Sequence, residues 1–309
     1  MRLLLEFMLD ALAPLARWHG GDLVRGIVFL AVAQAGRPGI LGLVRQGADV
    51  WPPREETPRL ISVNGLAASL ALPYETTRRH VQKLIAADLV ARRSGDGIAV
   101  PRAVVAGAAF DAYMAEVQAR MLQMMRALRG IGLDFRTLDR SDATSFVPLD
   151  TGTAPDWAVR QVTLDFMLRL VEAGTAVHEN DMLRAFVFTA IMSANAEPYR
   201  SDPERAWQYA TLAQSPPQLR RRPVTVRALS LRVGIPYETT RRCVAAMLKD
   251  KDIVRVGRAG LVNAQVTPRD AELHKAGLLT MSRFAQFIGD LKRLGVDFDA
   301  LVAAADRAA

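Results

Sequence analysis

Seven residues rich in hydrogen-bonding side chains occur twice in the sequence without a change. The segment PYETTRR at residues 73–79 returns at residues 236–242, in the second half of the chain. Each copy carries one phenol, one carboxylate, two hydroxyls and two guanidinium groups. Arginine can donate two parallel hydrogen bonds to a guanine edge or a phosphate, and carboxylates can accept from the cytosine amino group. The chemistry that this pattern predicts is recognition of a nucleic acid.

Each copy is expected to open a helix that follows a shorter one. Ser62 and Thr225 are suitable N-caps for the shorter helix, and apolar residues follow both at spacings of three and four. Pro73 and Pro236 can open the second helix, because the N–H that proline lacks would have no partner at a helix start. On this second helix Thr77 belongs to the apolar face, and most charged residues of the repeated segment point the other way.

A β-hairpin is predicted after each of these second helices. In the first copy its strands cover residues 89–93 and 98–100, with a turn at 94–97. In the second copy they cover residues 253–256 and 261–262, with a turn at 257–260. Matching Asp88 to Asp252 places one inserted residue before the second hairpin.

Two helices followed by a hairpin resemble the winged helix-turn-helix of bacterial transcriptional regulators, such as the MarR, GntR and IclR types. The resemblance covers residues 58–101 and 221–266. It implies a DNA-binding module whose second helix contacts base edges. Regulators of this kind commonly work as symmetric homodimers with terminal helices in the dimer core. The resemblance therefore implies that both protomers are joined here, so that a single chain acts as a fused dimer.

The duplication extends beyond these two modules. Phe7-Met8-Leu9 returns inside the chain as Phe166-Met167-Leu168, which favours a structural helix at the N-terminus over a signal peptide. Long amphipathic helices are expected near residues 105–129 and 271–293. Residues 139–157 are rich in turn-forming residue types and are expected to link the two repeats.

The predicted fold class is therefore mostly α with small β-hairpin wings. It consists of two tandem winged helix-turn-helix repeats with flanking helices, related by pseudo-twofold symmetry. The first repeat comprises residues 1–150 and the second residues 151–309. Half of the 309 residues are hydrophobic, which is enough to form two real cores.

A second polar pattern is also duplicated. It consists of His19, Asp22 and Arg25 in the first repeat and of His178, Asp181 and Arg184 in the second. One interpretation is a polar functional site, and the other is a helix N-cap, an interhelical ion pair and a loop histidine. We favour the second, because aspartate is a preferred N-cap and the spacing is not that of a metal site.

Basic residues are concentrated in the two modules. The formal net charge is +8. Residues 59–102 contain seven basic and three acidic side chains, and residues 220–258 contain eleven and three, so the remainder of the chain is slightly acidic. This distribution is typical of a surface that binds a polyanion. The run Arg220-Arg221-Arg222 has two interpretations, as a phosphate contact or as a solvated face.

Other classes of protein are disfavoured by composition. A single cysteine excludes a disulfide framework and fits a reducing cytosol, so we expect a cytoplasmic, nucleoid-associated protein. No stretch is long and apolar enough to span a bilayer, so no membrane is expected as a partner. The sequence has no glycine-rich phosphate loop, metal-ligand cluster or nucleophile–base arrangement, so we expect no enzymatic activity, metal or cofactor. It specifies no small-molecule effector.

The expected partner is double-stranded DNA, and the expected function is sequence-specific transcriptional regulation through two similar half-sites. The residues predicted to bind DNA in the first repeat are Tyr74, Glu75, Thr76, Arg78, Arg79, Gln82, Lys83, Arg92 and Arg93. Those in the second repeat are Tyr237, Glu238, Thr239, Arg241, Arg242, Arg255 and Arg258. The helix arginines would contact guanine or phosphate, the glutamates would accept from cytosine or orient an arginine, and the wing arginines would follow the backbone or minor groove.

Two other functions remain open. Plasmid replication initiators also carry two winged domains in one chain, although in the known families those domains are divergent in sequence. The winged domains of chromosome-condensation subunits bind proteins, and they would not need basic, identical helices. A footprint on origin repeats rather than on a promoter would favour the first alternative. Absence of DNA binding at low salt would favour the second.

Overall fold

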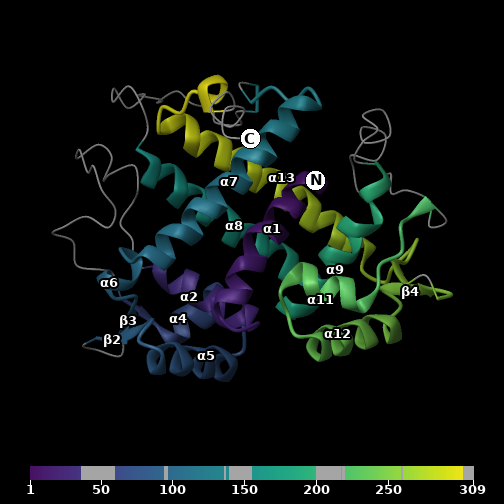
Figure 1. The fold of residues 1–309 in the computed structure, drawn as a ribbon, viewed down its shortest axis with the longest axis horizontal. Coiled ribbons are helices and arrows are strands. Elements are labelled where there is room, and N and C mark those ends of the chain that lie inside the picture. Colours follow the sequence, from purple (N-terminus) through teal and green to yellow (C-terminus); the bar gives the residue numbers. More distant parts are fainter. Residues whose placement is uncertain are drawn as a thin grey trace. The chain divides into compact units, whose positions relative to one another are not determined.

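The computed structural model describes residues 1–35, 60–93, 97–135, 137–138, 155–199, 217, 220–258 and 260–301. In these residues the protein is mostly helical, with two small antiparallel sheets (Figure 1). The predicted mostly-α fold class with short strands is therefore confirmed. Among the helices of these ranges, none combines the length and apolar character that crossing a membrane requires.

The chain forms two compact units. Unit 1 contains Met1–Val24 and Leu170–Met281, and unit 2 contains Arg25–Arg169 and Ser282–Ala309. Each unit therefore combines residues of both repeats. The repeats, which the sequence places at 1–150 and 151–309, and the compact units are different divisions of the chain.

Unit 1 is assembled around α9 (Met182–Asn195), which contacts α1, α11, α12 and β5 (Figure 1). Every residue from Arg184 to Ile191 is buried, as is typical of a helix surrounded by protein. The other elements of this unit are α1 (Arg2–Trp18), the end of α8 (Asp156–Val177), η1 (Glu197–Tyr199), α11 (Val226–Val233), α12 (Tyr237–Lys249), β4 (Ile253–Val256), β5 (Gly260–Asn263) and the first turns of α13 (Asp270–Arg293).

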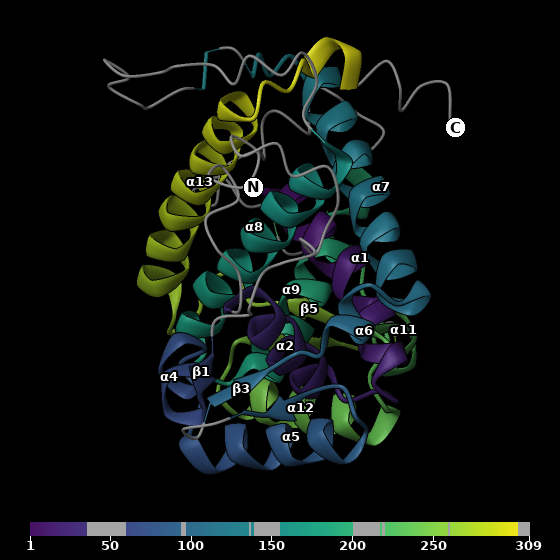
Figure 2. The same cartoon turned by 90° about the vertical axis from the view of Figure 1, so that its left-hand side faces the viewer.

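Unit 2 contains the corresponding part of the first repeat. Its elements are α2 (Leu23–Ala35) from Arg25 onward, β1 (Ile61–Ser62), α4 (Val63–Ser69), α5 (Tyr74–Ala86), β2 (Ala91–Arg92), β3 (Gly97–Ala99), α6 (Arg102–Val105), α7 (Ala108–Gly130), the start of α8 and the end of α13. β3 pairs with both β1 and β2, and α4 contacts α5 (Figure 2). Aromatic rings fill the core, where Phe166 stacks on Phe287 with ring centroids 4.5 Å apart.

The predicted N-caps of the two shorter helices are confirmed. Ser62 Oγ accepts a 3.0 Å hydrogen bond from the Gly65 N–H at the start of α4. Thr225 Oγ1 accepts a 3.2 Å hydrogen bond from the Ala228 N–H at the start of α11. Each bond satisfies one of the backbone donors that a helix start leaves without an intrahelical partner.

The two longer helices also begin alike. Pro73 is the N-cap of α5 and Pro236 that of α12, as the sequence predicts. Thr77 and Thr240 each donate a 3.2 Å hydrogen bond from the side-chain hydroxyl to the carbonyl of that proline. Thr77 is buried, which confirms that it belongs to the apolar face of α5.

The hairpins of the two repeats have the same register. Ala91 pairs with Ala99 and Arg92 with Ile98, and at the equivalent positions of the second repeat Val254 pairs with Val262 and Arg255 with Leu261. In both repeats the segment before the shorter helix also pairs with the second strand of the hairpin. Ile61 pairs with Ile98, and Val224 pairs with Leu261 at the equivalent position. Residues 94–96, which belong to the first predicted turn, and residue 259 lie outside the described residues.

The predicted insertion before the second hairpin is wrong. Asp88 and Lys251 occupy the same position relative to the ends of α5 and α12, and both have left-handed backbone, with φ of 55° and 62°. The residue equivalent to Asp88 is therefore Lys251. Asp252 has the same residue type as Asp88, but its position is that of Leu89.

The opening helix of the first repeat, α1, belongs to the unit that holds the module of the second repeat. The first part of α8, the opening helix of the second repeat, belongs to the unit that holds the module of the first. In unit 1, α1 contacts α9 and α11, and Ser193 Oγ donates a long 3.5 Å hydrogen bond to Glu6 Oε1. In unit 2, Gln34 Nε2 of α2 donates a 3.4 Å hydrogen bond to Asp165 Oδ1 of α8. These are the same two positions of the repeat, because Asp165 is the counterpart of Glu6 and Ser193 is the counterpart of Gln34. The repeats have thus exchanged α1 and the first part of α8.

The duplicated histidine, aspartate and arginine are structural in the second repeat. Asp181 caps α9 by accepting a 3.0 Å hydrogen bond from the Arg184 N–H. The Arg184 guanidinium pairs with Asp252 at 2.5 Å and with Asp250 at 2.7 Å. His178 is buried and packs edge-on against Phe188. The favoured interpretation as a cap and an ion pair is confirmed here, and no group of residues in the described part of the chain could hold a metal ion.

Candidate nucleic-acid interface

The predicted contact residues of the first repeat lie on the exposed face of α5. Thr77, Val81 and Leu84 form the buried face, because their spacing places them on the side of the helix that meets the core. On the other face Tyr74, Glu75, Arg79, Gln82 and Lys83 are exposed, and Thr76 and Arg78 are half-buried. Tyr74 keeps 48% of its surface exposed at the first position of the helix.

α12 presents the same side chains in the same way. Thr240, Val244 and Met247 are buried. On the opposite face Tyr237, Glu238, Arg241 and Arg242 are exposed, and Thr239 is half-buried. Tyr237 is 52% exposed, close to the value for Tyr74. The identity of the two segments therefore extends from sequence to the surface that each helix exposes to solvent.

Within each segment the glutamate holds the first of the two arginines. Glu75 Oε2 accepts hydrogen bonds from Arg78 Nε at 3.0 Å and Nη2 at 2.8 Å. Glu238 uses both carboxylate oxygens and accepts two 2.8 Å hydrogen bonds from Arg241. The hydrogen bond from Arg241 lowers the pKa of the Glu238 carboxyl, so the pair stays ionised. This geometry agrees with the interpretation that the glutamate orients an arginine.

The second arginine of each segment, Arg79 or Arg242, is the better candidate for a base contact. Both side chains are exposed next to the oriented arginine. An exposed guanidinium can present two parallel donors to O6 and N7 of a guanine in the major groove. Each first turn thus combines one arginine fixed by a carboxylate with one that points to solvent.

The predicted wing arginines are exposed as well. Arg92 lies on β2 with Arg93 directly after it, and Arg255 lies on β4. Arg258 follows β4 in the turn and is also exposed. The Arg93 N–H donates a 2.8 Å hydrogen bond to the Gly97 carbonyl, so a backbone hydrogen bond holds this arginine beside β3.

Within the run at residues 220–222, Arg220 and Arg222 are exposed, and Arg221 has a different role from either interpretation offered by the sequence. Arg221 is buried, and its Nη1 donates to the carbonyls of Asn263 at 2.5 Å and Ala264 at 3.1 Å. It therefore fixes the chain that follows β5. Burial lowers the pKa of Arg221, but arginine stays charged at any ordinary pH. Arg222 pairs with Glu197 at 2.5 Å.

The single cysteine is half-buried on α12. Burial raises the pKa of the Cys243 thiol to about 11, so it is a neutral thiol near pH 7. It is a packing residue of this helix.

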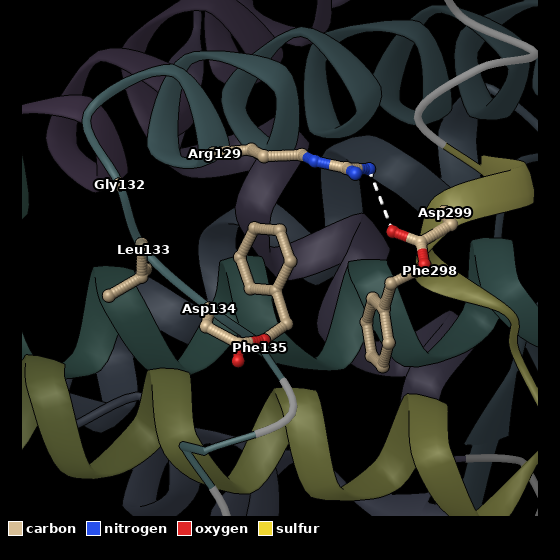
Figure 3. Close-up of a pocket in the computed structure, with 7 residues that line it drawn as sticks. All are labelled: Arg129, Gly132, Leu133, Asp134, Phe135, Phe298 and Asp299. Carbon is tan, nitrogen blue, oxygen red and sulfur yellow. Dashed lines mark ion pairs between the residues drawn. The ribbon is translucent and has the colours of Figure 1, made fainter.

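A shallow hollow of about 330 Å³ lies at the ends of α7 and α13 in unit 2 (Figure 3). Phe135 and Phe298 face each other there with ring centroids 5.4 Å apart, and Arg129 pairs with Asp299 at 2.9 Å. The two phenylalanines occupy equivalent positions of the two repeats. The two rings are buried and the two charges are paired. The residues around the hollow thus connect the segment after α7 to the segment after α13.

Compared with family models, curated proteins and solved structures, the chain matches none.

Proposed function

We propose that the protein is a sequence-specific transcriptional regulator that binds double-stranded DNA through two winged helix-turn-helix modules, one in each unit. The observation that carries the proposal is the duplicated exposed surface of α5 and α12. Both helices place a tyrosine, a glutamate and two arginines at the same positions, after the same capped helix and before a hairpin of the same register.

Core packing does not require this surface to be preserved. Thr77 and Thr240 are buried and must fit the interior, but Tyr74, Glu75 and Arg79 are exposed, as are their counterparts. The residue pairs that follow have diverged, since Gln82 corresponds to Ala245. Identical exposed side chains next to diverged ones are expected where both copies must fit the same ligand surface. The basic charge of the modules makes DNA that ligand.

The proposal assigns a role to each group. Arg79 and Arg242 contact base edges, and Arg78 and Arg241 contact a base or phosphate in the orientation set by the paired glutamate. The tyrosines and Thr76 and Thr239 contact phosphates or a thymine methyl group near the helix start. The wing arginines follow the backbone or the minor groove. Two equal surfaces in one chain predict one bipartite site with two near-identical half-sites.

Selection from a random double-stranded DNA library with the full chain tests the proposal. We expect a motif that contains the same half-site twice, and one chain per duplex by mass measurement. Arg79→Ala and Arg242→Ala should each weaken binding by about 1–3 kcal/mol, which is roughly 5- to 150-fold. Lys275→Ala is the matched control, because it removes one exposed positive charge of α13 outside both modules.

Three outcomes would count against the proposal. If both arginine variants bind as the unchanged protein does, the assignment of α5 and α12 is wrong. If no DNA is bound even at low salt, the modules bind protein instead. If the enriched motif maps to origin repeats rather than to promoters, the chain is a replication initiator.

A further inference from the structure

We propose that α1, which belongs to the first repeat, positions the recognition helix α12 of the second repeat. This inference rests on the proposed function only in that α12 contacts DNA. Residues 1–24, which lie far from α12 in the sequence, would then help to position the helix that reads the second half-site.

The first contact is made by the corner that follows α1. Gly21 has left-handed backbone with φ of +84°, and a Cβ atom at this residue would lie 2.8 Å from Cδ of Pro236. Pro236 is the N-cap of α12, and Tyr237 and Glu238 follow it directly. The corner therefore lies against the start of the recognition helix, without room for a side chain.

In the second contact the glycine belongs to the α11–α12 turn and the atom that it meets belongs to α1. Gly234 lies in the turn between α11 and α12, and a Cβ atom at this residue would lie 2.9 Å from the Ala13 carbonyl oxygen of α1. The turn before α12 is thus packed directly against the backbone of α1. Figure 1 shows α1 alongside α11 in this unit.

These glycines are explained by close approach rather than by backbone conformation alone. Gly234 has φ of 68°, and the equivalent residue of the first repeat, Ala71, has φ of 51°. Gly21 has φ of 84°, and its equivalent Asn180 has φ of 64°. Residues with a Cβ therefore adopt the same left-handed conformation at the equivalent positions. Left-handed backbone alone therefore does not require glycine at residues 21 and 234, whereas the close contact between α1 and the α11–α12 turn leaves no room for a Cβ atom at either residue.

Polar groups connect the same elements. Arg232 of α11 contacts Asp10 of α1 at 3.5 Å and donates a 3.3 Å hydrogen bond to Ser193 Oγ. Ser193 in turn donates to Glu6 of α1. The apolar side of α1 beneath these contacts is fully buried, with Leu9, Leu12 and Leu15 in the core. α1 is therefore a fixed support, and a change at its end is transmitted to the start of α12.

Gly21→Asn tests this inference, because asparagine tolerates left-handed backbone but adds a Cβ that meets Pro236. Gly132→Asn is the matched control. Gly132 has nearly the same φ of +86°, but no atom lies within 4 Å of the position of its Cβ. We expect Gly21→Asn to weaken binding to the bipartite site by about tenfold, and Gly132→Asn to leave it within about twofold.

A double-mutant cycle identifies the recognition helix through which Gly21 acts. Gly21→Asn should keep its full effect in the Arg79→Ala background and lose most of it in the Arg242→Ala background, where the second helix has already lost its base contact. The inference is overturned if the effect is equal in both backgrounds, or if it disappears in the Arg79→Ala background.

A second measurement is independent of DNA. In hydrogen exchange of the full chain, Gly21→Asn should increase exchange in the peptide that covers the first turn of α12 and leave the equivalent turn of α5 unchanged. Unchanged exchange in both turns would overturn the inference even if DNA binding is lost. If exchange changes as expected but neither arginine variant affects DNA binding, the proposed function fails and the positioning of α12 by α1 stands.

Discussion

The Asp252 carboxylate accepts a 2.5 Å hydrogen bond from Arg184 Nη2, at the point where the chain leaves α12 for β4. Asp252 is only 1% exposed, and Arg269 Nε adds a 3.3 Å contact to the same carboxylate oxygen. A carboxylate removed from water this completely is tolerated only when it is paired. The network ties α9, the end of α12 and the start of α13 together inside unit 1.

Asp252→Ala should therefore be strongly destabilising. It leaves the buried Arg184 without its main partner, and breaking a buried pair in this way costs about 3–5 kcal/mol. Asp250→Ala is the control, because it removes a carboxylate that pairs with the same arginine at 2.7 Å but has a side chain that is 42% exposed. Its effect should be much smaller than that of Asp252→Ala, because solvent screens an exposed ion pair. Urea unfolding of the three proteins measures both values, and equal losses would contradict the prediction.

His178 should make the stability of the protein depend on pH. Burial lowers the pKa of its imidazole to about 4, and the nearby Arg269 and Arg184 lower it further while Asp252 and Asp181 act against them. The folded state thus holds a neutral ring, whereas the unfolded chain takes up a proton near pH 6.5. The stabilisation is fully present above about pH 6.5 and is lost as the pH falls towards 4, by about 3 kcal/mol in all.

Replacing the ring isolates its contribution. His178→Gln should remove this part of the pH dependence, so that its unfolding free energy falls less steeply between pH 7 and pH 5 than that of the unchanged protein. Urea titrations at three or four pH values in this range are sufficient. Parallel curves for the two proteins would show that His178 is not the group responsible.

The helices and hairpins could be predicted because their determinants are local. Ser62 and Thr225 are caps recognised by residue type, and the apolar spacing after Pro73 and Pro236 specifies which face of the next helix is buried. The exposed face of the candidate interface follows from the same periodicity. The pairing of Glu75 with Arg78 was one of two alternatives, and it is favoured because side chains three residues apart on a helix are neighbours.

The exchange of opening helices could not be predicted from the sequence. α1 and α8 carry the same apolar motif, so the hydrophobic pattern alone does not specify which of them covers α9. The choice depends on contacts between distant residues, such as Gly21 with Pro236, that no local pattern encodes. The structural role of Arg221 could not be predicted for the same reason, because its acceptors are backbone carbonyls that lie far from it in the sequence.

Salt should weaken DNA binding steeply. Each phosphate neutralised by an arginine contributes a slope of about −0.9 to the dependence of log K on log salt concentration. Removing Arg92 and Arg93 together should make the slope shallower by up to about 1.8, if both contact phosphates. Titrations at four salt concentrations measure the slope, and Lys275→Ala should leave it unchanged. An affinity that is flat between low and physiological salt would exclude phosphate contacts altogether.

The helices α5 and α12, which we propose as recognition helices, should differ at their second turn. α5 exposes Gln82 and Lys83 there, and α12 exposes Ala245 and Ala246 at the equivalent positions. Alanine cannot hydrogen-bond to a base or a phosphate through its side chain, so the first helix has two potential contacts that the second lacks. One half-site should therefore extend further than the other, and this asymmetry should orient the chain on its DNA.

Exchanging these pairs tests the prediction. Gln82→Ala with Lys83→Ala should weaken binding by about 1–3 kcal/mol and abolish the preference for an extended half-site, if one base contact is lost. Ala245→Gln with Ala246→Lys should instead give a preference for two extended half-sites. Competition between probes with one, two or no extended flanks measures both effects. Equal affinity of the unchanged protein for all three probes would show that base recognition ends with the shared segment.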